Sequence, residues 1–583
     1  METGLLTQYF TRNYFDMKLF SKNLFNDINT VFSFASALIA IVQLILQVTW
    51  HYYVITLGSV FIIWIFICFY RINRRPWHKK MRNPLIIRAK RSTYPWGTFF
   101  NTVFTRPYYE GPFISPSFSS NMKPLFDNNF NTNRLTVVVV EDDPVGYAAN
   151  IGMLPCIPVE DNVSQFSLYE QIISLDKEIS KYRMFFIATP SRRLSHEKSL
   201  VLNREIGFAL RKYFGDKTEK DVRIISKIDS CLRSNYEAEY EGLSDGLGKR
   251  ECIEILVPSY VEQGRVTLHG CQYIKTGGEF KRMENSEFSS FKGLEYDNSD
   301  LALWMEKRVP HVRSRKKIGL VDIDSLRTES SVDIANKICS TSAKAFVFDT
   351  VEIDDLYLVS QVIHQLEIKG KTLFLKFGPS MINCYAKEYA LPKAKNSLSH
   401  IRKADRGIFI AGSLTSITKK QIERYDGFLN TSIVTIRESD LENMNNVDNT
   451  IKSRSDKIVK LNKSGDDVIL TTEYWKTNKN EYPDIQKRDT VLSILAKICQ
   501  EIRQTDTRWF LLKGSDTALY TIIHGLDIKH YYYCGQFVPG VIHCKCQYDG
   551  HLKSFFIVGG NVGSPDLLAT LRKHINTVIS ETE

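Results

Sequence analysis

The chain has 583 residues, 43% of them hydrophobic and 24% charged, so it is long enough for several domains and apolar enough to bury packed cores. Its net charge of +11 is concentrated in nine Lys or Arg between Arg71 and Arg91; the rest is close to neutral, which argues against nucleic acid as a partner. The eleven cysteines are scattered without a C-x-x-C pair, and no Cys or His spacing predicts a metal site, a pattern typical of reduced, cytosolic proteins and not of disulfide scaffolds.

The first predicted element is a membrane hairpin within residues 1–70. Residues 31–70 hold almost no charge, which is too long for one bilayer span and suitable for two, at 31–48 and 53–70. Basic residues on both flanks predict a cytoplasmic N-terminus and cytoplasmic domains after the hairpin, with the lipid bilayer as a partner. The alternative is a hydrophobic helical hairpin buried inside a soluble domain.

Residues 71–133 are rich in Pro, Asn, Ser and aromatic residues and predict a basic linker. From 134 to 310, apolar strand-like runs alternate with helical segments, the first helix being expected near 166–181. This alternation predicts an α/β domain with a parallel sheet, closed by a helix at 299–309.

A second α/β series is predicted over 316–583, opening with the run IGLVDI at 318–323. The polar stretch 438–489 predicts an insertion loop within it. The expected fold class is therefore two Rossmann-like three-layer α/β domains with a cleft between them, preceded by the transmembrane hairpin.

Charged residues, with one serine and one glycine, follow the predicted strands of the first domain: Asp142, Asp143, Arg192, Lys227, Asp229, Ser230, Arg233, Gly264 and Arg265. The ends of strands are where open α/β sheets place their ligand crevice. Arginines there can clamp a carboxylate, and an aspartate can act as a base for a hydroxyl proton. Asp142 and Asp143 are adjacent and would point oppositely in an extended segment, so we favour Asp143 as the base. Structural ion pairs, or a helix cap at Asp143, are the alternatives.

The second domain carries glycine turns with hydroxyl groups: Gly412, Ser413, Thr418, Gly514, Ser515, Asp516, Thr517, Gly560, Asn561 and Gly563. No G-x-x-x-x-G-K-[ST] sequence is present, so phosphates would be held by these turns and their backbone N–H groups. Asp516 could hold Mg²⁺ or orient a ribose. Ordinary tight turns are the alternative.

Taken in order, these motifs resemble those of the four-carbon acid sugar kinases, a family formerly described as a domain of unknown function and as Hrp-dependent type III effector-like proteins. The resemblance implies ATP and Mg²⁺ as cofactors and a sugar acid such as threonate or erythronate as substrate. Five positions depart from the family's pattern: Val145, Tyr147, Cys231, Ser234 and Val558 replace Thr, Ala, Thr, Gly and Lys.

We therefore expect a membrane-anchored, ATP-dependent kinase that phosphorylates a hydroxyl of a small sugar acid. The alternative is a catalytically inactive, kinase-like module that binds a ligand or scaffolds a membrane partner. A Rossmann dehydrogenase is disfavoured because no G-x-G-x-x-G follows a strand and opens a helix. The sequence makes no prediction of oligomeric state.

Overall fold

The computed structural model divides the chain into two compact units, 1–95 and 96–583, and every residue described below belongs to the second. The residues described are 135–143, 153–215, 221–249, 252–276, 279–290, 294–309, 317–389, 398–402, 405–426, 430–442, 447–473, 485–503, 507–548, 551–560 and 562–580.

The structure contradicts the predicted membrane localisation. Among the described residues, no helix is both long and apolar enough to cross a bilayer. The predicted passes at 31–48 and 53–70, and the linker at 71–133, lie outside the described residues.

The first half of the described chain is built on parallel strands in the order β2-β3-β1-β4-β11-β5-β10-β9. Strand β1 includes four consecutive valines and is almost wholly buried, as expected for a parallel strand covered on both faces. The bounds of these strands are β1 Thr136–Glu141, β2 Leu154–Pro158, β3 Met184–Ala188, β4 Val222–Lys227, β5 Ile253–Val257, β9 Ile318–Val321, β10 Ala345–Phe348 and β11 Leu373–Phe377.

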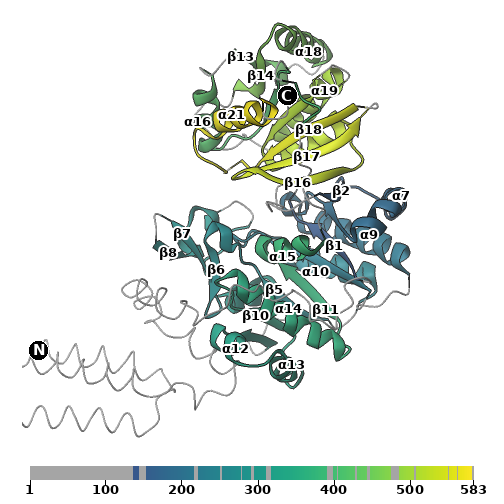
Figure 1. Cartoon of the computed structure of the whole chain (residues 1–583), viewed down its shortest axis with the longest axis vertical. Coiled ribbons are helices and arrows are strands. Elements are labelled where there is room, and N and C mark those ends of the chain that lie inside the picture. Colours follow the sequence, from purple (N-terminus) through teal and green to yellow (C-terminus); the bar gives the residue numbers. More distant parts are fainter. Residues whose placement is uncertain are drawn as a thin grey trace, which may run out of the picture. The chain divides into compact units, whose positions relative to one another are not determined.

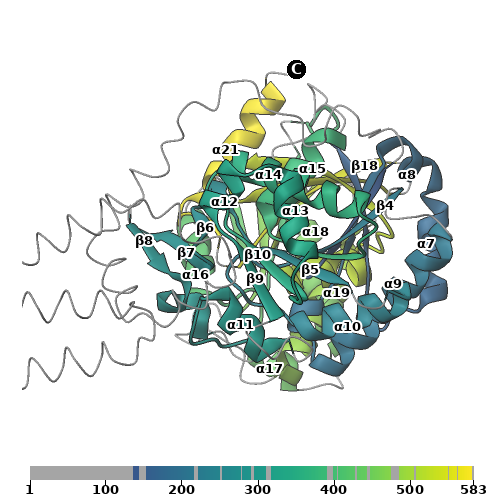
Figure 2. The same ribbon diagram turned by 90° about the horizontal axis from the view of Figure 1, so that it is seen from below.

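Helices α9 (His196–Phe214) and α10 (Tyr236–Leu247) pack side by side (Figure 2). Glycines allow the close approach, because a Cβ at Gly246 would lie 2.2 Å from the Arg204 carbonyl oxygen. The helix expected near 166–181 is two helices that meet at Leu175. The other helices of this half are α7 Gln165–Ser174, α8 Asp176–Tyr182, α11 Leu301–Arg308, α12 Ile323–Thr328, α13 Ser331–Cys339, α14 Ile353–Ile368 and α15 Pro379–Tyr389.

A small antiparallel sheet, β6 (Arg265–Leu268), β7 (Cys271–Thr276) and β8 (Glu279–Arg282), is attached to this half. The buried carboxylate of Asp349 anchors its first turn by accepting hydrogen bonds from the backbone N–H groups of His269 and Gly270, both at 2.8 Å.

The second half continues the sheet in the order β13-β14-β12-β15-β18-β17-β16, parallel from β13 to β18 and antiparallel beyond. Its strands are β12 Ile408–Ala411, β13 Thr431–Ile436, β14 Asp467–Thr472, β15 Trp509–Lys513, β16 Tyr531–Val538, β17 Val541–Tyr548 and β18 His551–Val558. Its helices are α16 Ser416–Tyr425, α17 Glu438–Glu442, α18 Val447–Lys463, α19 Ile485–Ile502, α20 Ser515–Tyr520 and α21 Leu567–Ser580.

Two expected boundaries differ from this arrangement. Strands β9, β10 and β11 were expected in the second domain, which was to begin at 316. Instead β11 pairs with β4 and β5 of the first half, β10 pairs with β5, and β9 pairs with β10. The stretch 438–489, expected to be an insertion loop, contains α17, α18 and β14, and β14 lies between β13 and β12 in the sheet. Its polarity comes from the exposed faces of these helices.

The two halves meet where β16 pairs with β2 in antiparallel register, which joins the described strands of both into one sheet (Figure 1). At this junction the Tyr533 hydroxyl donates a 2.7 Å hydrogen bond to the buried carboxylate of Glu141. The parallel-rich sheet with helices is the mixed α/β architecture expected for two Rossmann-like domains.

Candidate substrate and nucleotide site

Each half contains a point at which the strand order reverses. In the first half the chain leaves β1 for β2 and β3 on one side and then crosses to β4 on the other. In the second half it leaves β12 for β13 and β14 and then crosses to β15. Ligands of open α/β sheets bind outside the carboxyl ends of the strands at such points. Most of the predicted site residues follow β1, β3, β4, β12 and β15, while Gly264 and Arg265 follow β5, and Gly560 and Gly563 follow β18.

A charged cluster occupies the carboxyl ends of β1, β3 and β4. Asp142 accepts a 2.6 Å hydrogen bond from the Lys227 ammonium and contacts the Arg192 guanidinium at 2.9 Å. Asp143 contacts the same guanidinium at 2.6 Å. Burial favours the neutral form of Asp142, but the charges of Arg192 and Lys227 outweigh it and hold its pKa below the usual range. Asp142 is therefore a carboxylate that orients cations.

The loop after β4 brings a second cluster together. The Arg233 guanidinium donates to Asp229 at 2.6 Å, and Arg265 reaches Ser230 at 3.5 Å. Both guanidinium groups lie against the ring of Phe288, 5.1 and 5.7 Å from its centroid. Although burial acts in the opposite direction, Arg233, Arg192 and Arg265 all lower the pKa of Asp229. Three arginines from separate loops therefore surround one carboxylate.

Glycine is required at the turn that presents Arg265. Gly264 has a φ of +66°, and a Cβ there would lie 2.6 Å from the Lys275 Cβ on the neighbouring strand. Any other residue would be strained and would displace the β6–β7 hairpin.

A buried network that the sequence analysis missed holds these loops in place. Glu239 of α10 accepts hydrogen bonds from the hydroxyls of Ser191 and Ser234, both at 2.9 Å, and pairs with the ammonium of Lys376. The Asn235 amide donates to the Ser191 carbonyl at 2.7 Å. The signal was a single lysine inside the apolar run TLFLKFG, because an unpaired lysine is almost never fully buried.

In the second half, three glycine turns converge on Ser413. A Cβ at Gly560 would lie 2.7 Å from the Ser413 hydroxyl, and a Cβ at Gly514 would lie 3.1 Å from the Ser413 Cβ. A Cβ at Gly412 would lie 2.5 Å from the hydroxyl of Thr517. Side chains larger than glycine would collide with these neighbours, so the glycines allow the turns to pack closely against one another.

Hydroxyl groups fix the turns to one another. Thr415 caps α16, and its hydroxyl also donates to the Gly560 carbonyl at 2.6 Å. The Thr418 hydroxyl contacts Ser413 at 3.1 Å and the same carbonyl at 3.1 Å. Thr418 thus acts within the scaffold of the turns.

Lys513, at the end of β15, is a second lysine that the sequence analysis missed. Its ammonium donates to the carbonyl oxygens of Gly559 at 2.7 Å, and of Gly560 and Val562 at 3.3 Å each. Its register partner on β18 is Val558, the position where the family's pattern has lysine.

The charged clusters of the first half and the glycine turns of the second half lie close together across the junction of β2 and β16. Arg193, in the turn Ser191–Arg193 (η2), forms an ion pair with Asp516 of α20, with Nε and Oδ1 3.5 Å apart. Partial burial raises the pKa of Asp516; Asp143 acts in the same direction, while Arg193 and Arg488 of α19 oppose it. Of the positions singled out from sequence, Val145, Tyr147 and Asn561 lie outside the described residues.

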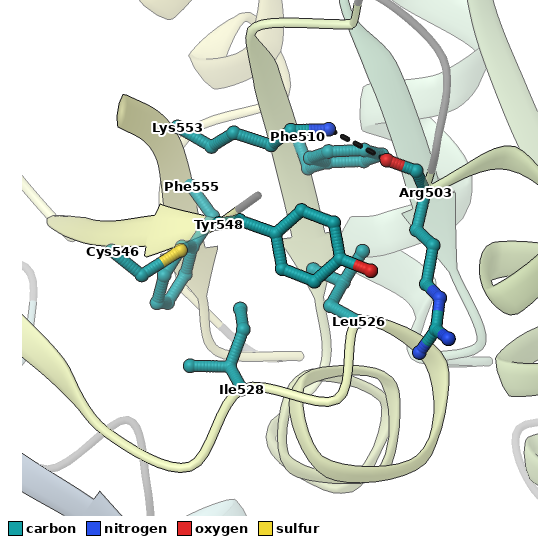
Figure 3. Close-up of a pocket in the computed structure, with 8 residues that line it drawn as sticks. All are labelled: Arg503, Phe510, Leu526, Ile528, Cys546, Tyr548, Lys553 and Phe555. Carbon is teal, nitrogen blue, oxygen red and sulfur yellow. Dashed lines mark hydrogen bonds between the residues drawn. The ribbon is translucent and has the colours of Figure 1, made fainter. Parts of the chain in front are cut away.

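A small pocket in the second half lies away from these turns, near the start of β18 (Figure 3). Its cavity of about 10 Å³ has room for one water molecule at most. The Lys553 ammonium crosses it to donate to the Arg503 carbonyl at 2.7 Å. This pocket, which Tyr548 helps to line, is a small packing defect. The candidate site is instead formed by the charged clusters of the first half and the glycine turns of the second.

Comparison with known proteins agrees with the division of the described chain into two halves. Residues 137–384 match a sugar-binding N-terminal domain, and residues 408–568 match a nucleotide-binding C-terminal domain. The first match includes β9, β10 and β11, as the strand pairing does. No curated protein matches the chain.

Two solved structures share the fold. The Haemophilus influenzae protein HI1011 is 15% identical, with a TM-score of 0.53, over 76% of this chain and 100% of that one. A Salmonella typhimurium protein described as a candidate tRNA synthase is 14% identical, with a TM-score of 0.55, over 75% and 98%. At this identity the likeness establishes the fold alone.

The chain is thus a two-domain protein that joins a sugar-binding domain to a nucleotide-binding domain. The two matches together span more than half of it. The pairing of these two domains, in this order, matches the four-carbon acid sugar kinase family.

Proposed function

We propose that this protein is a kinase that transfers the terminal phosphoryl group of ATP to a hydroxyl of a small sugar acid, such as threonate or erythronate. The contact between Arg193 and Asp516 carries the proposal, since it brings the arginine-rich loops of the sugar-binding domain next to the glycine turns of the nucleotide-binding domain. Phosphoryl transfer depends mostly on such positioning and on neutralising charge.

Each group has a proposed role. Arg192, Arg233 and Arg265 bind the substrate carboxylate, with Lys227, Ser230 and Gly264 shaping the same pocket. Among Asp142, Asp143 and Asp229, Asp143 is the proposed base, because neighbouring cations lower the pKa values of the other two and make them weaker proton acceptors. Asp143 is also the one whose charge reaches Asp516.

The nucleotide-binding residues are proposed to be the glycine turns: Gly412, Ser413, Thr418, Gly514, Ser515, Asp516, Thr517, Gly560, Asn561 and Gly563. ATP would supply the phosphoryl group, and Mg²⁺ would neutralise phosphate charge. Within the described residues, no group of three or more His, Cys, Asp or Glu side chains could hold a metal. Mg²⁺ would be bound by phosphate oxygens, and Asp516 is the carboxylate proposed either to contact it or to orient the ribose.

A second function is a ligand-binding module without catalysis. The departures at Cys231, Ser234 and Val558 favour it; Ser234, for example, is committed to Glu239. The test is to incubate the full-length chain with Mg-ATP and a panel of four-carbon sugar acids, measuring ADP release and nucleotide-dependent thermal stabilisation. Acid-dependent ADP release supports the kinase. Stabilisation by ATP with no turnover on any acid supports the module, and no effect of nucleotide would exclude both nucleotide-dependent functions.

A further inference from the structure

Lys513 is a buried amine whose positive form the described residues around it do not neutralise with a carboxylate. Its side chain has no exposed surface, and its three ammonium hydrogens are matched by three neutral carbonyl oxygens, those of Gly559, Gly560 and Val562. Lysines are rarely buried without a carboxylate, because removing an ammonium from water is costly.

The groups that surround Lys513 and its carbonyl partners are neutral hydrogen-bonding groups. The β12–α16 turn contributes the hydroxyls of Ser413, Thr415 and Thr418 around the Gly560 carbonyl. Helix α16 adds the Gln421 amide, which donates to the carbonyls of Val562 and Ser564.

The only strand neighbour on the β18 side is the apolar Val558, and the carboxylate carried by α20, on Asp516, is paired with Arg193. Burial is accordingly what lowers the pKa of Lys513, to about 7. The ammonium lies directly behind the glycine turns with its charge uncompensated by any of these groups.

We propose that Lys513 is the cation that compensates the nucleotide phosphates, and that it takes up a proton when a polyphosphate binds the glycine turns. An anion near a buried amine stabilises the charged form, and the effect is large where water is excluded. The lysine acts through the turn it holds, so it is a positioning residue, and it does not touch the reacting atoms. This inference rests on the proposed nucleotide site, and it adds that nucleotide binding there is coupled to proton uptake by Lys513.

The test is calorimetric titration of the full-length chain with Mg-ADP at about pH 8, in buffers that differ in ionisation enthalpy. We expect the wild-type chain to take up close to ~1 proton per ADP bound, because the lysine is mostly neutral at that pH before binding. Lys513→Met should take up fewer protons and bind ADP at least about tenfold more weakly. Lys513→Arg, which stays charged, should bind ADP without the uptake.

Lys553→Met is the matched control, because its ammonium is also buried and donates to a carbonyl, that of Arg503, away from the turns. It should retain the wild-type uptake. ADP binding without proton uptake by the wild-type chain, or equal uptake by Lys513→Arg, would overturn the inference and leave the proposed function standing. Absence of ADP binding by the wild-type chain would overturn both.

Discussion

Arg193 and Asp516 form an ion pair between the two domains, with 3.5 Å between Nε and Oδ1. Arg193 directly follows the Arg192 that contacts Asp142 and Asp143, and Asp516 lies in the turn after β15. The pair therefore connects the residues proposed for the sugar acid with those proposed for the nucleotide. One site would serve both ligands, as direct phosphoryl transfer requires.

Replacing Asp516 with Asn tests this arrangement. The change keeps the shape of the side chain but removes the charge that faces Arg193 and Asp143. We expect kcat to fall about a hundredfold, as a small misplacement of reacting groups does, while the KM for the sugar acid changes little. Asp527→Asn, an exposed carboxylate paired with Lys529, should leave kcat unchanged. Equal kcat values for the wild-type and Asp516→Asn proteins would remove Asp516 from the site.

Replacing Arg265 with Ala tests the proposed carboxylate pocket. Its weak 3.5 Å contact with Ser230 leaves the guanidinium able to bind a ligand. A hydrogen bond to a charged group contributes about 1.5–3 kcal/mol, so the KM for the acid should rise about ten- to a hundredfold. ADP affinity, measured by calorimetry, should not change. The control is Arg308→Ala on α11, which should leave the KM for the acid unchanged. An unchanged KM in Arg265→Ala would contradict the assignment of Arg265 to the carboxylate pocket.

The strands were predictable from sequence because buried parallel strands are continuous apolar runs, such as TVVVV in β1. Their partners were not predictable. Strands β9, β10 and β11 have the same character as those that follow, and only long-range pairing places β11 between β4 and β5. The expected domain boundary near 310–316 therefore separated β9, β10 and β11 from the strands of the first half to which they belong.

The candidate site residues are visible in the sequence as charges at strand ends, and in the structure Asp142 contacts both Arg192 and Lys227. Glu239 and Lys513 were missed for a different reason. Glu239 lies inside a helix and Lys513 ends an apolar strand, so neither stands out at a strand end followed by a turn. Their partners, Lys376 and the Gly559 carbonyl, are also distant in sequence. Local patterns do not reveal such pairs.

Replacing Asp142 with Ala should strongly destabilise the fold. The ion pair between Asp142 and Lys227 is almost wholly buried, and removing the carboxylate leaves the ammonium without its partner. Breaking a buried pair in this way costs about 3–5 kcal/mol. Urea unfolding followed by circular dichroism measures the loss. Asp161→Ala is the matched control, because Asp161 pairs with the exposed Lys198 and should cost at most ~1 kcal/mol. Similar losses for the two variants would contradict the reasoning.

Glu141 should make stability fall as pH rises. Burial raises its pKa from 4.5 to about 8, although Lys227 and the Tyr533 hydroxyl act in the opposite direction. Between these two values the folded chain retains a proton that the unfolded chain has lost, so the free energy of unfolding decreases with increasing pH. The contribution is complete below about pH 4.5 and is lost as pH passes through 8.

Glu141→Gln replaces this group with a neutral amide whose oxygen can still accept the Tyr533 hydrogen bond. The variant should show a flatter dependence of unfolding free energy on pH between 5 and 8, and it should be more stable than the wild-type chain near pH 8 by on the order of a few kcal/mol. Urea unfolding at several pH values measures both effects. Glu170→Gln, at an exposed position on α7, should keep the wild-type slope. If Glu141→Gln keeps that slope as well, Glu141 is ionised in the folded chain, and the junction of β2 and β16 tolerates a buried negative charge.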